Sequence, residues 1–139
     1  MDRVHSVFVD TAQSGFLLEE SFMHSILVIE DNESILGILK QVLVNFGHNV
    51  ETANDGKEGI SKFDKGLFDL VITDIDMPGK NGNEVAYHIR NSDRQQIPIL
   101  GISGTPRLMQ YTVFDSTLQK PFRLTTFINT VNNLFQAQG

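Results

Sequence analysis

Five short segments, each about as long as a β-strand, alternate with segments of helical spacing from residue 25 onward. These strand-like segments are residues 25–29, 49–53, 68–73, 98–102 and 117–119, of which 25–29 is a continuous apolar run typical of a strand buried on both faces. Apolar side chains recur at helical spacing over residues 33–46, 55–65, 83–91 and 123–136, whereas residues 104–115 allow at most a short helix. This alternation predicts a parallel sheet with helices on both of its faces.

The length of this region narrows the fold further. Five strands and five crossovers in fewer than about 120 residues are typical of a flavodoxin-like, doubly wound α/β domain. The predicted strand order is 2-1-3-4-5, with about five helices, of which the fourth is shortened or irregular.

The first 22 residues differ from the segments that follow them. Residues 7–9 favour a short strand and residues 15–22 show weak helical spacing, whereas a clearer pattern begins at Met23. We therefore interpret residues 1–22 as an N-terminal extension and residues 23–139 as one domain, with Met23 as the hypothetical natural start. A loosely ordered tail, or a tail that packs on a neighbouring subunit, is the alternative.

Composition excludes several classes of protein. The formal net charge of -6 argues against binding to nucleic-acid phosphates in bulk, and the lack of cysteine excludes disulfides, thiolate metal sites and a cysteine nucleophile. No apolar run approaches the ~18 residues of a membrane span, and the N-terminus does not resemble a signal peptide. We expect a cytoplasmic protein that binds neither nucleic acid nor membrane. The histidines show no metal-ligand spacing, and we expect surface positions for His5, His24, His48 and His88.

Reactive side chains follow four of the predicted strands. In a sheet of this kind ligands bind beyond the carboxyl ends of the strands, where this chain places Glu30, Asp31, Asp74, Ser103 and Lys120. Crowded carboxylates need a compensating cation, and Mg²⁺ suits oxygen ligands. A hydroxyl and a lysine beside the ion would hold a phosphoryl group, with Asp74 on the central strand as the nucleophile.

These residues carry a resemblance to a known family. Residues 25–136, about four-fifths of the chain, resemble the receiver domain of a bacterial two-component response regulator of the stand-alone, CheY-like type. The resemblance depends on several segments that are specific only in combination, namely the acidic pair at 30–31, VITDIDMP at 71–78, the Gly82 loop, residues 99–103 and Lys-Pro-Phe at 120–122.

The resemblance implies a role for each acidic residue. Asp74 would be the phosphoacceptor. Asp31 and Asp74 would bind Mg²⁺ through their side chains, and Asp76 would bind it through its backbone carbonyl. Glu30 would act through a metal-bound water.

The resemblance also implies roles for the remaining site residues. Ser103 would contact the phosphoryl oxygens. Lys120 would pair first with Asp74 and then with the phosphate. The bond between Lys120 and Pro121 is a candidate for the cis form.

The chain departs from the family pattern in two places. Family members usually have an aromatic residue three positions before the lysine, where this chain has Thr117. Tyr111 and Phe114 do not match that spacing. The separation between Ser103 and Lys120 is only 17 positions, so we expect an altered fourth helix.

The function implied by the resemblance is a phosphorelay module. A sensor histidine kinase or a histidine phosphotransfer protein would supply the phosphoryl group, and contact with a downstream protein would carry the signal. A homodimer is a further expected partnership. Two alternatives stay open: a pseudo-receiver scaffold that is never phosphorylated, and a phosphatase of the haloacid dehalogenase type, whose motif order argues against it.

Overall fold

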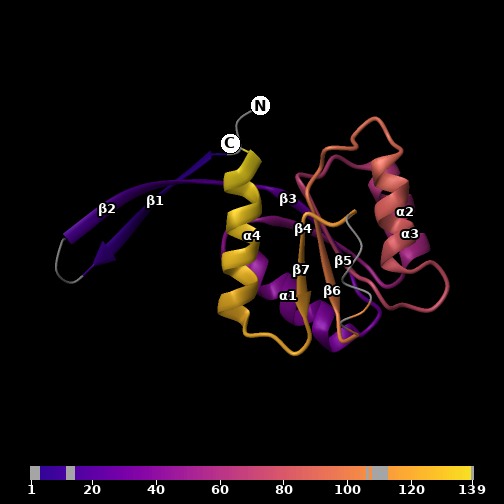
Figure 1. Cartoon of the computed structure of the whole chain (residues 1–139). Coiled ribbons are helices and arrows are strands. Elements are labelled where there is room, and N and C mark those ends of the chain that lie inside the picture. The colour runs from indigo at the N-terminus through magenta and orange to yellow at the C-terminus, as the bar shows by residue number, and fades with distance from the viewer. Residues whose placement is uncertain (1–3, 12–14, 106, 108–112, 139) are drawn as a thin grey trace.

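The computed structural model describes residues 4–11, 15–105, 107 and 113–138 (Figure 1). Its centre is a parallel sheet with the strand order β4-β3-β5-β6-β7. Its strands are β3 (Ser25–Ile29), β4 (Asn49–Ala53), β5 (Leu70–Asp74), β6 (Ile99–Ser103) and β7 (Ser116–Gln119). Counted from β3, this is the predicted order 2-1-3-4-5, and the flavodoxin-like fold class is confirmed.

Helices cover both faces of the sheet (Figure 1). One face carries α1 (Glu33–Asn45) and α4 (Leu124–Gln138), and the other carries α2 (Gly56–Lys65) and α3 (Gly82–Arg90). The irregular fourth helix expected between β6 and β7 falls on a segment in which residues 106 and 108–112 lie outside the description. Among the residues described, no helix has both the length and the apolar character that crossing a membrane requires.

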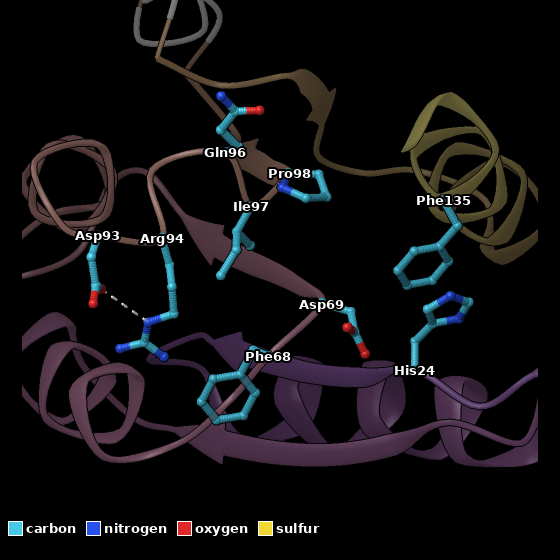
Figure 2. Close-up of a pocket in the computed structure, with 9 residues that line it drawn as sticks. All are labelled: His24, Phe68, Asp69, Asp93, Arg94, Gln96, Ile97, Pro98 and Phe135. Atoms are coloured by element: carbon cyan, nitrogen blue, oxygen red, sulfur yellow. Dashed lines mark ion pairs between the residues drawn. The ribbon is translucent and has the colours of Figure 1, made fainter. Parts of the chain in front are cut away.

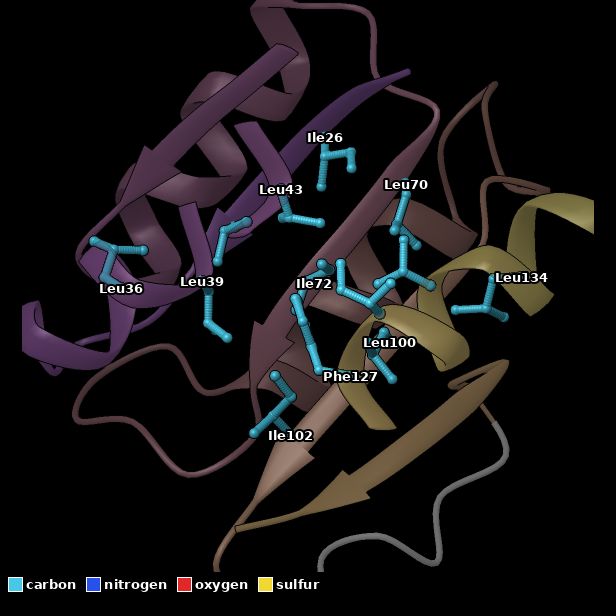
Figure 3. Close-up of a cluster of buried hydrophobic side chains, with 13 residues drawn as sticks. Ile26, Leu36, Leu39, Leu43, Leu70, Ile72, Leu100, Ile102, Phe127 and Leu134 are labelled. Carbon is cyan, nitrogen blue, oxygen red and sulfur yellow. The ribbon is translucent and has the colours of Figure 1, made fainter. Parts of the chain in front are cut away.

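Successive side chains of the central strands enter two separate cores. Leu70 and Ile72 of β5 face α1 and α4, whereas Val71 between them faces α2 and α3. Figure 3 shows the first core, where Leu39 of α1 and Phe127 of α4 meet the sheet. Neighbouring strand residues point to opposite faces, so a strand covered on both sides needs a continuous apolar sequence.

Short polar side chains begin the helices that follow β3, β4 and β5. Asn32, Asp55 and Asn81 each accept a hydrogen bond from the backbone N–H three residues later, at the start of α1, α2 and α3. After α1 the chain turns at Gly47, whose φ of 90° lies in the left-handed region that favours glycine. These ends determine where the loops between strands and helices lie.

The N-terminal residues form a strand pair. β1 (Val4–Thr11) pairs antiparallel with β2 (Gly15–Phe22) along the whole length of both strands. The short strand expected at residues 7–9 lies within β1. The weak helical spacing over residues 15–22 was misleading, because the backbone groups of this segment are paired across the hairpin instead of within a helix.

Two histidines belong to a half-buried aromatic cluster, so the surface positions expected for them are wrong. The His24 ring stacks on Phe135 of α4 with 3.7 Å between ring centres, and the His48 ring lies 5.5 Å from each of them. Figure 2 shows His24 and Phe135 at one end of a pocket. Burial, with a smaller contribution from the charge of His24, lowers the pKa of His48 to about 4.

We expect His48 to make the free energy of unfolding rise more steeply with pH, between about 4 and 6.5, than it would without this group. The pKa of His48 is lower in the folded chain than in the unfolded chain, so the unfolded chain binds more protons in this window. The variant His48→Asn keeps an acceptor for the His24 N–H but does not titrate, and its stability should rise less steeply. Denaturant unfolding across this pH range measures both slopes, and equal slopes would contradict the assignment.

Candidate functional site

Four strands deliver the predicted site residues to one edge of the sheet. Glu30 follows β3, Asp74 ends β5, Ser103 ends β6 and Lys120 follows β7. The parallel register pairs Asp74 with Ile102, one residue before Ser103, so these carboxyl ends are level with one another. The sheet therefore brings together side chains that lie far apart in the sequence.

The Lys120 amine lies between two buried carboxylates. Its Nζ is 3.1 Å from Oδ2 of Asp74 and 2.8 Å from Oε1 of Glu30. Glu30 is 1% exposed and Asp74 is 5% exposed, so neither charge is well hydrated. Removal of the amine would leave two buried like charges without a partner, which is strongly unfavourable.

The pKa values of Glu30 and Lys120 depend on their burial and on the charged groups beside them. Burial raises the pKa of Glu30 to about 7, against the hydrogen bonds from Lys120 and from the Asn32 backbone, which lower it. Burial alone would lower the pKa of Lys120, but the Glu30 and Asp74 carboxylates outweigh it and raise that pKa above its usual value. Lys120 therefore stays cationic beside the carboxylate of Asp74.

Three carboxylates form a group that could hold a metal ion. One oxygen from each of Glu30, Asp31 and Asp74 lies within 4.8 Å of the others. Asp31 is exposed while the other two are buried, so the group opens toward solvent. Oxygen donors with a solvent-facing side fit Mg²⁺, which keeps several of its waters when bound.

The Ser103 hydroxyl is at the same edge but is engaged elsewhere. It accepts a hydrogen bond of 2.9 Å from the Thr105 N–H and donates one of 3.2 Å to the Thr105 carbonyl. The backbone carbonyl of Ser103 accepts a bond from the Lys120 N–H at 2.8 Å. The structure thus places Ser103 beside Lys120, with its hydroxyl bonded into the loop that follows β6.

Two further predicted residues border Asp74 and Lys120. The Asp76 N–H donates to Oδ1 of Asp74 at 3.3 Å, and the Asp76 side chain is exposed. The peptide bond between Lys120 and Pro121 is cis.

Sequence reasoning missed the contribution of Asn32. Its backbone N–H donates to Oε2 of Glu30 at 3.1 Å, while its side chain begins α1. An asparagine directly before an acidic first helical turn is a typical helix start, and that signal was present at Asn32 and Glu33.

A pocket of about 420 Å³ lies away from these residues (Figure 2). His24, Asp69 and Pro98 line it, and each directly precedes the strand β3, β5 or β6. The pocket is therefore at the amino ends of the strands, opposite the carboxylates.

A known family shares this sequence pattern. The sequence profile of the response regulator receiver domain matches residues 26–132. The chain belongs to this family of receiver domains.

Curated relatives of this receiver domain are longer proteins. The CAI-1 autoinducer sensor kinase/phosphatase CqsS of Vibrio cholerae is 35% identical over 113 residues, which cover 76% of this chain and 16% of CqsS. The uncharacterized transcriptional regulatory protein YrkP of Bacillus subtilis is 38% identical over 104 residues, which cover 71% of this chain and 44% of YrkP. The chain thus spans less than half the length of either relative.

A solved structure has the same fold. The response regulator protein TrrA of Thermotoga maritima, in complex with Mg²⁺-BeF, superposes with a TM-score of 0.75 at 33% identity. The match covers 81% of this receiver domain and 99% of the TrrA chain. The three clustered carboxylates of this receiver domain, Glu30, Asp31 and Asp74, are compatible with Mg²⁺, the ion named in the complex of that relative.

We expect Gly82→Ala to destabilise the receiver domain by about 1–3 kcal/mol, because the new methyl group overpacks against the end of β5. A Cβ at Gly82 would lie 2.4 Å from the Asp74 carbonyl oxygen and 2.7 Å from Cα of Ile75. Denaturant unfolding measures the change.

Gly37→Ala is the matched control. Gly37 lies in the exposed middle of α1 with nothing within 4 Å of its Cβ position, so the same substitution should stabilise the fold by about 0.5–1 kcal/mol. Equal effects of the two substitutions would contradict the close approach at Gly82.

Proposed function

We propose that this receiver domain accepts a phosphoryl group on Asp74 from a histidine kinase or a histidine phosphotransfer protein. The observation that carries the proposal is the position of the Asp74 carboxylate, which is buried, paired with the Lys120 amine and grouped with Glu30 and Asp31. A carboxylate held beside a fixed cation is a competent phosphoryl acceptor, because the cation stabilises charge on the transferred group.

The proposed transfer is an in-line displacement. An oxygen of Asp74 attacks phosphorus, the bond from phosphorus to the donor nitrogen breaks, and the product is an acyl phosphate. Lys120 turns from Asp74 to a phosphoryl oxygen, and the Ser103 hydroxyl donates to another. Both groups stabilise the transferring charge and thus assist the reaction.

The proposed Mg²⁺ ligands are the side chains of Asp31 and Asp74 and the backbone carbonyl of Asp76, with Glu30 acting through a water. When bound, the ion supplies positive charge beside the carboxylates and the phosphoryl oxygens. The spacing of the three carboxylates and their mixed burial support this assignment.

The proposed partners are a phosphodonor protein and a downstream protein target, with readout by protein contact in the cytoplasm. The likeness to a protein named as a sensor kinase/phosphatase supports a phosphodonor of the histidine kinase class. Membership of the receiver family argues against the haloacid dehalogenase alternative. A homodimer remains part of the proposal.

A pseudo-receiver scaffold is the second candidate. Thr117 stands where the resemblance leads one to expect an aromatic residue, and it is half-buried on β7. The Ser103 hydroxyl is bonded to Thr105 and not to Asp74. A scaffold would tolerate both features, and phosphorylation distinguishes the two candidates.

Incubation with Mg²⁺ and acetyl phosphate should add one phosphoryl group to the chain, measured by intact mass. Asp74→Asn should abolish the adduct, because the amide is not a nucleophile at this site. Glu51→Gln removes an exposed carboxylate from β4, away from the site, and should keep the adduct. If the wild-type chain takes up no phosphoryl group from acetyl phosphate or from a phosphorylated histidine donor, the result would support the scaffold instead.

Removing the exposed carboxylate of Asp31 should weaken Mg²⁺ binding by about tenfold or more, since it removes a direct ligand. Titration calorimetry of wild type and Asp31→Asn measures the affinity. Glu51→Gln removes an exposed carboxylate from β4 and should leave the affinity unchanged. Equal weakening in both variants would indicate a general effect of charge and contradict the site.

A further inference from the structure

Arg90, the last residue of α3, is held by acceptors from the loop before β6 and from the segment before β7. Its Nε and one terminal nitrogen donate to the Val113 carbonyl at 3.2 and 2.9 Å, and the other terminal nitrogen donates to the Gln95 and Ile97 carbonyls, each at 2.7 Å. The terminal nitrogen that bonds Val113 also donates to the Asp115 carboxylate, at 2.6 Å. These five charge-assisted bonds use the whole donor capacity of a guanidinium group.

Asp115, which is bonded to Arg90, also forms hydrogen bonds with the start of β6. The Asp115 carboxylate accepts a bond from the Ile99 N–H at 2.7 Å, and the Asp115 N–H donates to the Ile99 carbonyl at 2.9 Å. Phe114 is buried, and its ring lies 2.9 Å from where a Cβ on Gly101 would be. We call Arg90 together with residues 113–115 the Arg90 junction.

Residues 113–115 of the Arg90 junction immediately precede β7, and Lys120 directly follows β7. β7 has 4 residues, is half-buried or exposed throughout, and pairs with β6 as the last strand in the sheet order. A strand this short at an edge has little packing of its own to maintain its register. A slip of one residue would turn every side chain of β7 to the opposite face.

The position of β7 matters because the backbone of Lys120 lies far from Asp74, the residue that its amine contacts. β7 is two strands from β5 in the sheet, which is about 9–10 Å at the usual strand spacing. The Lys120 side chain must therefore cross the end of β6 to bring its amine to 3.1 Å from Asp74. A small displacement of the backbone at Lys120 would take the amine out of range of Asp74.

We propose that Arg90 is a positioning residue for the phosphoacceptor site. By fixing the start of β7 against α3 and β6, the Arg90 junction sets the register of this edge strand and places the Lys120 amine beside Asp74. The inference rests on the proposed function only for the effect on phosphoryl transfer. The structural effect on β7 and Lys120 stands independently of it.

The test compares Arg90→Met with Arg94→Met. Both substitutions remove one guanidinium of similar side-chain exposure, 24% for Arg90 and 25% for Arg94. Arg94 contacts the Phe63 ring and the Gly66 carbonyl on the α2 side and has no bond to residues 113–119 among those described. Arg94→Met therefore controls for loss of charge and for general destabilisation.

Amide hydrogen exchange in the full chain reads the structural effect. In Arg90→Met the amides of β7 and of Lys120 should exchange about tenfold faster or more, because the lost charge-assisted bonds held the start of the strand. The amides of β3, and those of β7 in Arg94→Met, should stay protected. Equal exchange at β7 in both variants would overturn the proposal.

The second readout separates positioning from general damage. The rate of labelling of Asp74 by acetyl phosphate should fall about tenfold in Arg90→Met, since misplacing a catalytic group by about 1 Å can cost more than this. Mg²⁺ affinity should not fall, because its proposed ligands are at the ends of β3 and β5 and displacement of the Lys120 amine removes a positive charge from beside them. A parallel fall in both quantities, or faster exchange with an unchanged labelling rate, would overturn the positioning role.

Asp115→Asn provides a milder variant if Arg90→Met does not fold. It keeps an oxygen for the Ile99 N–H but loses the ion pair with Arg90, so both effects should appear in weaker form. If wild-type chain takes no phosphoryl group, the proposed function fails, and the exchange comparison alone decides whether Arg90 positions β7 and Lys120.

Discussion

The contact of the Lys120 amine with Glu30 and Asp74 is the interaction on which the whole site depends. Two carboxylates buried this close together repel each other and lose most of their hydration. One cation from another strand compensates both of them at distances of 2.8 and 3.1 Å. Burial nevertheless raises the pKa of Glu30 to about 7, although the hydrogen bond from Lys120 lowers it.

The doubly wound sheet explains why these charges meet. The central strands β3, β5 and β6 are buried along nearly their whole length, so charged side chains are excluded there and appear where these strands end. Parallel strands end at the same edge of the sheet, so these side chains meet there. The backbone of Lys80 in the β5–α3 loop packs against Gly56 of α2, and Gly82 packs against the Asp74 backbone. Main-chain contacts as well as side chains therefore hold the carboxylates in place.

Most of the sheet and of the site could be predicted from the sequence, because both depend on local patterns. Strand-length segments alternating with helical spacing located all five parallel strands, and reactive side chains after four of them located the site. Features that depend on tertiary contacts could not be predicted in this way. Nothing near Arg90 in the sequence indicates that its acceptors lie at Val113 and Asp115, and the pairing of residues 15–22 with β1 overrides their weak helical spacing.

The hydrogen bonds of the Ser103 hydroxyl connect the phosphoryl site to the loop that follows β6. The hydroxyl makes two bonds with Thr105, and a phosphoryl oxygen on Asp74 would compete for the same hydroxyl. An anionic oxygen is the stronger acceptor, so engagement at Asp74 would release the loop after β6 at its start. The Arg90 junction holds Val113 and Asp115 to α3 and β6, so a change in the bonds at Thr105 would leave the start of β7 in place.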